Sequence, residues 1–310
     1  MNFEVTILGC NAAVPMHGRH PSAQVLRVRN RLYLIDCGEG TQMRMSAFKI
    51  ARSRIHQIFI SHLHGDHLFG LIGLLTSLSL QDRKDALHVY APEGVQEIVD
   101  VFKKYSQVHF SYPLHIHAID TTQSNLIHED DVVQVFSIPL EHRVPCAGFL
   151  FKERQSVPSI IPEAIEQYQI PFSEINAIKN GANFVAPDGR IIPHEQLTRP
   201  APAPRSYAYC SDTVYSPSIV PQIMGVNLLY HEATFLSEAA DRAKKYAHST
   251  AQEAAKIAAE AKVGMLLIGH YSSKYASSLP LLAEAMRYFP DTVAAEEGKT
   301  YPIPQHKIRG

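Results

Sequence analysis

Three histidines and one aspartate fall within six residues of the chain: His62, His64, Asp66 and His67. The segment follows the apolar run 58–60 and precedes the apolar run 68–80, which predicts that it lies between a buried strand and a helix. Residues two apart on an extended segment point the same way, so the first two histidines can bind one metal ion. Gly65 then allows a turn that presents the aspartate and the third histidine to a second ion. The segment predicts two adjacent metals, because solvated histidines seldom lie between apolar runs.

Three further residues with the same chemistry each follow an apolar strand: His142, Asp212 and His270. Strand ends that share one edge of stacked sheets line a common cleft, so we expect these residues to converge with the first four. Each ion then receives three ligands of its own, His62, His64 and His142 on one and Asp66, His67 and His270 on the other. Asp212 bridges both ions. Carboxylate and imidazole donors without thiolate suit Zn²⁺, with Mn²⁺ or Fe²⁺ as replacements.

Paired metal ions of this kind carry out hydrolysis. Two ions about 3.5 to 4 Å apart hold a bridging water, lower its pKa and clamp the oxygens of a phosphoryl centre. The ligand set therefore predicts a hydrolase. The simpler interpretation of each distal ligand is a capping or turn residue at the end of a strand.

Composition fits a globular protein without membrane segments. The chain has 310 residues, of which 45% are hydrophobic, enough for one large core or two modest ones. No apolar run approaches the roughly 18 residues of a transmembrane helix, and the N-terminus lacks the pattern of a secretory signal. The cysteines are widely spaced in or beside apolar segments, at positions 10, 37, 146 and 210. They predict buried free thiols in a reducing cytoplasm.

Charge is distributed unevenly along a chain whose formal net charge is −1. Residues 19–54 carry eight Lys or Arg against two acidic residues, a net charge of +6, and the remainder carries −7. One interpretation is a phosphate-binding face on one side of the molecule. The other is that Arg27, Arg29 and Arg31 form the solvent side of an alternating strand.

Strand and helix patterns alternate along the chain and predict an α/β fold. Strand patterns occupy residues 3–8, 25–28, 32–37, 132–138, 206–210, 226–230 and 263–268. Helical spacing begins at residue 95, and Thr250 with Glu253 has the form of a capping box that starts a helix reaching about residue 262. His248 then lies just ahead of a helix N-terminus, where a phosphate can approach. Eight prolines between 152 and 205 predict an inserted segment.

Two further histidines share a face by their spacing, His115 and His117. No apolar strand leads them to the edge that the candidate ligands share. We expect both to be exposed and not to bind metal.

The segment 62–67 resembles the signature of the metallo-β-lactamase superfamily, and further motifs resemble those of the ribonuclease Z family within it. These motifs occur in the order of the family over nearly the whole chain: Asp36-Cys37-Gly38-Glu39-Gly40-Thr41-Gln42, His142-Arg143-Val144-Pro145, Ser211-Asp212-Thr213, His231-Glu232-Ala233-Thr234-Phe235, His248-Ser249-Thr250 and His270-Tyr271-Ser272-Ser273-Lys274-Tyr275. The resemblance implies the metallo-β-lactamase fold, an αβ/βα sandwich of two mixed sheets flanked by helices. It also implies one domain over residues 1–310 with a protruding flexible arm at 152–205, two zinc ions per chain in the partition given above, and a homodimer.

The resemblance further implies the reaction and the catalytic residues. It implies a zinc-dependent endoribonuclease in the cytoplasm that removes the 3′ trailer from precursor tRNA, leaving a 3′-hydroxyl on the tRNA and a 5′-phosphate on the trailer. Asp66 would take a proton from the water, His248 would donate one to the leaving oxygen, and Glu232 would orient His248. No membrane partner and no nucleotide cofactor are expected.

The arm is where this chain departs from the family pattern. In the family the arm clamps the body of the tRNA. Here it carries six basic and six acidic residues and lacks the glycine-proline and lysine-rich tip often found there.

Two other functions use the same residues. A small-molecule phosphodiesterase would have the same metal site but no need of an arm. A non-catalytic RNA-binding module with a structural metal fits less well, because four ligands usually close a structural zinc site and seven candidates are present here, with His248 in addition.

Overall fold

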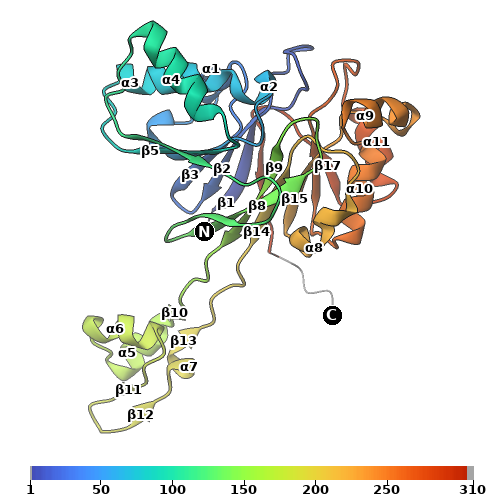
Figure 1. The fold of residues 1–310 in the computed structure, drawn as a ribbon. Coiled ribbons are helices and arrows are strands. Elements are labelled where there is room, and N and C mark those ends of the chain that lie inside the picture. Colours follow the sequence, from blue (N-terminus) through green and yellow to red (C-terminus); the bar gives the residue numbers. More distant parts are fainter. Residues whose placement is uncertain (1, 306–310) are drawn as a thin grey trace. The chain divides into compact units, whose positions relative to one another are not determined.

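Two mixed seven-stranded sheets form the framework of residues 2–305, which are the residues that this computed structural model describes (Figure 1). The first sheet has the order β18-β1-β2-β3-β4-β5-β6, with β1 at Phe3–Gly9, β2 at Ala23–Val28, β3 at Arg31–Ile35, β4 at Ile55–Phe59, β5 at Leu87–Ala91, β6 at Leu114–Ala118 and β18 at Thr300–Pro302. The second has the order β17-β16-β15-β14-β9-β8-β7, with β7 at Leu126–Glu129, β8 at Val133–Leu140, β9 at Cys146–Glu153, β14 at Ser206–Cys210, β15 at Leu228–Glu232, β16 at Leu266–Gly269 and β17 at Thr292–Ala294.

The two sheets pack face to face over one aromatic and aliphatic core. The ring of Phe59 on β4 lies 5.5 Å from that of Phe149 and 5.3 Å from that of Phe151, both on β9 of the other sheet. All three side chains are fully buried, and burying a side chain of this size stabilises the fold by about 1.5 to 3 kcal/mol. The core therefore holds the two sheets, and the loops at their ends, in fixed positions.

Helices cover the outer face of each sheet (Figure 1). Leucines of α3 (Gly70–Leu80) pack on the first sheet together with residues of α1 (Thr41–Ala47) and α4 (Val95–Ser106). Residues of α8 (Val220–Ile223), α10 (Ala251–Glu260) and α11 (Leu279–Met286) pack on the second. In the chain, α2 (Gly65–Leu68) lies between α1 and α3, and α9 (Ala240–Tyr246) lies between α8 and α10. Single 3₁₀ turns occur at Arg52–Arg54, Pro217–Ile219 and Ser237–Ala239. The predicted αβ/βα sandwich of mixed sheets is confirmed.

The capping box predicted for α10 is present. The Thr250 side chain accepts a hydrogen bond from the backbone N–H of Glu253, and the backbone N–H of Thr250 donates to the Glu253 carboxylate at 2.8 Å. Four of the five alanines of this helix are buried against the second sheet, and Ala259 is exposed. The chain just ahead of the helix, including His248, is thereby held at a defined place.

Residues Glu153–Pro204 form a compact unit of their own. The unit contains three helices and two antiparallel strand pairs, β10–β13 and β11–β12, within its described residues. In chain order these elements are β10 (Ser159–Ile160), α5 (Pro162–Tyr168), α6 (Phe172–Lys179), β11 (Phe184–Val185), β12 (Ile191–Ile192), α7 (His194–Leu197) and β13 (Thr198–Arg199). It has a small core in which Ile178 and Leu197 are almost fully buried. Sequence patterns predicted an insertion here but not this core, because its apolar residues are scattered among prolines and polar residues.

The prediction for His115 and His117 is partly wrong. Both lie on β6, the edge strand of the first sheet, so an ordered strand does carry them. His115 is exposed as expected, whereas His117 is partly buried and its Nε2 lies 2.9 Å from Nδ1 of His88 on the neighbouring strand. The short strand was missed because only three of its five residues are apolar.

The arginines of the basic stretch have partners within the protein. Arg27 pairs with Glu4 at 3.2 Å, and Arg31 pairs with Asp131 at 2.9 Å. These contacts favour the solvent side of a strand over a free phosphate-binding face. All four cysteines are buried and free, which confirms the prediction of unpaired thiols. No helix within residues 2–305 is long and apolar enough to cross a membrane.

Candidate metal centre

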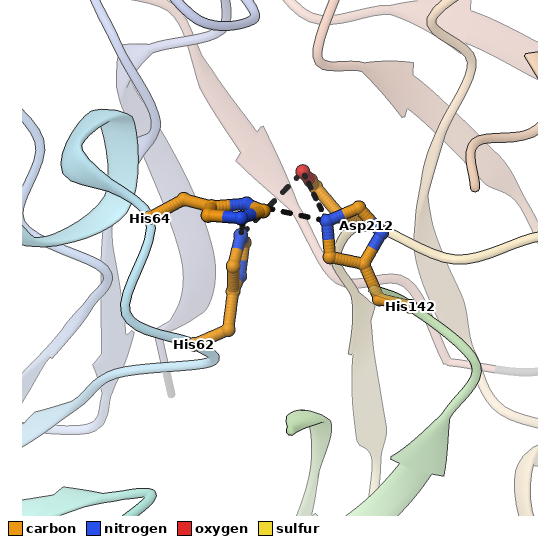
Figure 2. Close-up of side chains that lie close together, drawn as sticks. All are labelled: His62, His64, His142 and Asp212. Carbon is orange, nitrogen blue, oxygen red and sulfur yellow. Dashed lines mark hydrogen bonds and ion pairs between the residues drawn. The ribbon is translucent and has the colours of Figure 1, made fainter. Parts of the chain in front are cut away.

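The seven predicted ligands come together at one edge of the sandwich. They follow the ends of β4, β8, β14 and β16, so strands of both sheets deliver them. His62, His64, His142 and Asp212 place one ligand atom each within 4.8 Å of one another, and Figure 2 shows the three rings converging on the carboxylate. A second group of this kind contains Asp66, His67 and His270.

Asp212 lies between the two groups and turns one oxygen toward each. Its Oδ2 is 3.6 Å from Nε2 of His62 and 3.8 Å from Nε2 of His142. Its Oδ1 is 3.4 Å from Nε2 of His67 and 3.2 Å from Nε2 of His270. This is the arrangement that a carboxylate bridging two ions requires.

Hydrogen bonds on the far side of each ring fix which nitrogen faces the site. Nδ1 of His142 donates to the carbonyl of Ala247 at 2.8 Å, and Nδ1 of His270 lies 3.0 Å from Oγ1 of Thr234. Nε2 of each ring therefore points inward. His64 is turned the other way, because its Nδ1 lies 3.1 Å from Nε2 of His62 and 3.2 Å from Nε2 of His142. Outer hydrogen bonds of this kind hold metal-binding histidines in one orientation.

Asp36 is a functional residue to which the sequence analysis gave no role. Its carboxylate lies 2.7 Å from Nδ1 of His67 and accepts hydrogen bonds from the Tyr209 hydroxyl at 2.6 Å and the Ser61 backbone N–H at 2.7 Å. It is fully buried and has a positive φ of 53°. Asp36 directly follows β3, so the strand-end rule that found the seven ligands also applied to it.

Burial and charge set the protonation of the cluster. Burial lowers the pKa of His62, His64 and His142, so these rings are neutral at pH 7 and their nitrogens can bind metal. Burial alone would also lower the pKa of His67, but the carboxylates of Asp212, Asp66 and Asp36 outweigh it and raise that pKa to about 10. The second group thus attracts a positive charge.

A metal ion fits this cluster on two grounds. Oδ1 of Asp212 is buried without any hydrogen-bond partner among the described residues, although a buried carboxylate oxygen normally has one. The carboxylates of Asp212, Asp66 and Asp36 all lie near His67 and raise its pKa, so the group carries an excess of negative charge that a cation would compensate. Both observations point to a missing positive charge, and the donors are those of a zinc-type site.

His248 pairs with Glu232 and also belongs, with Asp212 and His270, to a third group whose possible ligand atoms lie within 4.8 Å of one another. Nδ1 of His248 lies 2.9 Å from Oε1 of Glu232, which is fully buried and also accepts from the backbone N–H groups of Thr213 and Thr234. Burial alone would lower the pKa of His248, but the Glu232 carboxylate raises it to about 9. His248 is thus held in its protonated form, 3.9 Å from Oδ2 of Asp212.

A pocket of about 460 Å³ opens onto these side chains. Asp66, Asp212 and His248 line it together with residues 12–15 and Arg143. The backbone N–H of Ala13, a residue with φ of 61°, donates to Oδ2 of Asp66 at 2.7 Å. Candidate metal ligands and the imidazole of His248 therefore face one cavity, an arrangement that can support metal-assisted hydrolysis with proton donation by a side chain.

Comparison with known proteins gives relatives over the whole chain. Ribonuclease Z of Bacteroides thetaiotaomicron is 46% identical over 301 residues, which cover 97% of this chain and 95% of the relative. The structure of the short form of human tRNase Z aligns with a TM-score of 0.71 and 26% identity, covering 97% of this chain and 99% of that one.

Other matches are more distant or shorter. A metallo-beta-lactamase fold protein of Bacillus subtilis aligns with a TM-score of 0.68 at 17% identity, over 97% of this chain and 100% of the other, and so shares the fold. A family model described as anti-Pycsar protein Apyc1 matches residues 3–128, less than half of the chain. High identity over nearly the full length is found with ribonuclease Z, and the chain belongs to the ribonuclease Z family.

Proposed function

We propose that this protein is an endoribonuclease that removes the 3′ trailer from precursor tRNA. The observation that supports this most strongly is that the seven candidate ligands converge beside the His248–Glu232 pair. They do so in a chain that matches ribonuclease Z over 97% of its length. The cut leaves a 3′-hydroxyl on the tRNA and a 5′-phosphate on the trailer.

We propose two zinc ions as the resident metals, one held by His62, His64 and His142 and the other by Asp66, His67 and His270. Asp212, with one oxygen toward each group, binds both. When bound, such ions polarise the phosphoryl centre and make a water molecule acidic enough to attack at neutral pH.

Two residues move protons in this proposal. Asp66, fixed by the N–H of Ala13, accepts a proton from the attacking water. His248 is protonated because Glu232 raises its pKa to about 9, and it gives its proton to the departing ribose 3′-oxygen. A ribose alkoxide is a poor leaving group, so proton donation is needed as the bond breaks.

The unit Glu153–Pro204 is proposed as the arm that binds the tRNA body. It has its own core and carries four basic residues against six acidic ones, so we expect apolar and hydrogen-bonding contacts to supplement ion pairs with phosphates. Phe172, Ile191 and Val185 are exposed on it by 89%, 66% and 61%. A homodimer and a cytoplasmic location complete the proposal, the latter supported by four unpaired thiols.

The reaction is tested by incubating the purified protein with a precursor tRNA and, in parallel, with bis(p-nitrophenyl) phosphate. We expect cleavage of the RNA and mapped ends that carry a 3′-hydroxyl on the tRNA and a 5′-phosphate on the trailer. Hydrolysis of the diester with no cut in the precursor would support a small-molecule phosphodiesterase instead.

The metal hypothesis predicts close to two zinc ions per chain by elemental analysis and loss of hydrolysis on chelation.

Asp212→Ala removes a ligand from both ions, so activity is expected to fall more than for any single histidine variant, by more than about 100-fold. Asp36→Asn is a milder comparison, because His67 is the one candidate ligand that Asp36 contacts among the described residues, and it is expected to weaken metal retention by about 10- to 100-fold. A fully active preparation with one tightly held ion per chain would rule out the dinuclear site.

The proton donor is tested with leaving groups of different basicity. His248→Ala is expected to slow cleavage of precursor tRNA by about 10²- to 10⁴-fold, with a much smaller loss on the nitrophenyl diester, because nitrophenolate leaves without a proton. Zinc content should stay the same. Loss of metal, or equal loss on both substrates, would assign His248 to metal binding or substrate positioning.

Glu232→Gln supplies a matched check on the same donor. If His248 is the acid, the rate of precursor tRNA cleavage falls as rising pH removes its proton. The variant lacks the carboxylate that raises the pKa of His248, so this loss should occur at lower pH. The alkaline limb of the pH–rate profile for precursor tRNA should therefore move to lower pH. An unmoved limb would show that another group is the acid.

The arm hypothesis predicts separate effects on large and small substrates. Lys152 and Ser206 are register partners of the antiparallel pair β9–β14, so residues 153–205 can be replaced by a two-residue Asn-Gly turn that closes a hairpin. KM for precursor tRNA should rise by about tenfold or more, because remote contacts are lost, with little change for the nitrophenyl diester. A similar loss on both substrates would show that the segment supports the fold.

A further inference from the structure

Three cations surround one tyrosine beside the pocket. The guanidinium carbon of Arg143 lies 5.9 Å from the centre of the Tyr246 ring, and that of Arg242 lies 5.7 Å from it. The ammonium of Lys245 is also 5.7 Å away. Arg143 lines the pocket that contains Asp66, Asp212 and His248, and Tyr246 lies two residues before His248.

These cations lack the partners that the other arginines have. Within residues 2–305, none of the three makes an ion pair or a side-chain hydrogen bond, whereas Arg27, Arg31 and Arg44 each pair with a carboxylate. All three side chains are exposed. A cation held over an aromatic face keeps its N–H donors free, because the ring takes no hydrogen bond in the plane of the guanidinium.

Unpaired cations next to the candidate metal ligands leave their N–H donors available to an anionic ligand that enters the pocket. A phosphodiester backbone supplies one, since each phosphate accepts two N–H bonds from a guanidinium in a matching fork. The position of Arg143, directly after the ligand His142, sets the distance between such a phosphate and the site of cleavage. Arg242 also lies 5.7 Å from the ring of Phe235, which limits its movement.

We infer that Arg143, Arg242 and Lys245, arranged around Tyr246, form a phosphate-binding rim that holds the RNA strand next to the scissile bond. The inference rests on the proposed function, since a small diester has no neighbouring phosphates to bind. Tyr246 is a positioning residue that acts through the cations. The rim contacts phosphates and not bases, so it adds affinity and register without sequence preference.

The test is the salt dependence of kcat/KM for precursor tRNA in the zinc-loaded protein. Each lost phosphate contact should reduce the slope of log(kcat/KM) against log salt by about 0.7 to 0.9. We expect this for Arg143→Met and for Arg242→Met, with zinc content unchanged and a larger loss on precursor tRNA than on the nitrophenyl diester. Arg31→Met is the matched control, because it removes the same charge from an exposed arginine that already pairs with Asp131, and its slope should equal that of the wild type.

Variants of Tyr246 test whether the aromatic ring positions the cations or whether their charge alone is sufficient. Tyr246→Phe keeps the ring face and should retain the slope, whereas Tyr246→Leu should reduce it although no charge is removed. The proposed rim would be contradicted if Arg143→Met and Arg242→Met both kept the wild-type salt dependence of kcat/KM. It would also be contradicted if Arg31→Met reduced that dependence by the same amount as they do. If the wild-type protein hydrolysed only the nitrophenyl diester, the proposed function itself would fail, which is a different result.

Discussion

The buried carboxylate of Asp212 is the constraint around which the site is built. A carboxylate removed from water is unfavourable unless positive charge or hydrogen bonds compensate it, and Oδ1 of Asp212 has no hydrogen-bond partner among the described residues. Four histidines direct Nε2 toward its two oxygens. Without metal, a proton on His67 partly meets this demand, because the surrounding carboxylates raise its pKa to about 10. Metal binding must displace that proton, so affinity for metal falls as the pH falls.

The rigid ends of the strands make such a cluster possible. Each ligand follows a strand whose other residues are buried in the sandwich, so the packing energy of the core holds groups together that would otherwise repel or remain solvated. This is also why the convergence of the seven candidate ligands was predictable. A His or Asp directly after an apolar strand is an uncommon pattern that can be recognised in a sequence. Sheet geometry then brings the ends of the strands to one edge.

What the sequence did not reveal depends on contacts between distant segments. Asp36 has the strand-end signal, but its role follows only from the 2.7 Å contact with His67 and the hydrogen bond from Tyr209, which lies 173 positions further along the chain. The N–H of Ala13 is a backbone group with no signature in residue type. The core of the unit Glu153–Pro204 was missed because short, scattered apolar residues meet only once the chain has folded.

One short loop links a candidate metal ligand to the proposed proton donor. The carbonyl of Ala247 accepts a hydrogen bond from the ligand His142, and the next residue, His248, is held by Glu232. Ala247 has a positive φ of 57°, a costly conformation for a residue with a side chain, and the capped start of α10 fixes the chain just beyond it. Because the same loop orients the candidate ligand His142 and the proposed acid His248, movement of one displaces the other. Thr234 adds a second link, since its hydroxyl donates to Glu232 at 2.6 Å and lies 3.0 Å from Nδ1 of His270. Proteins that share only the fold need not share this link between His142 and His248. The link suits the proposed cleavage, in which the leaving oxygen needs a proton.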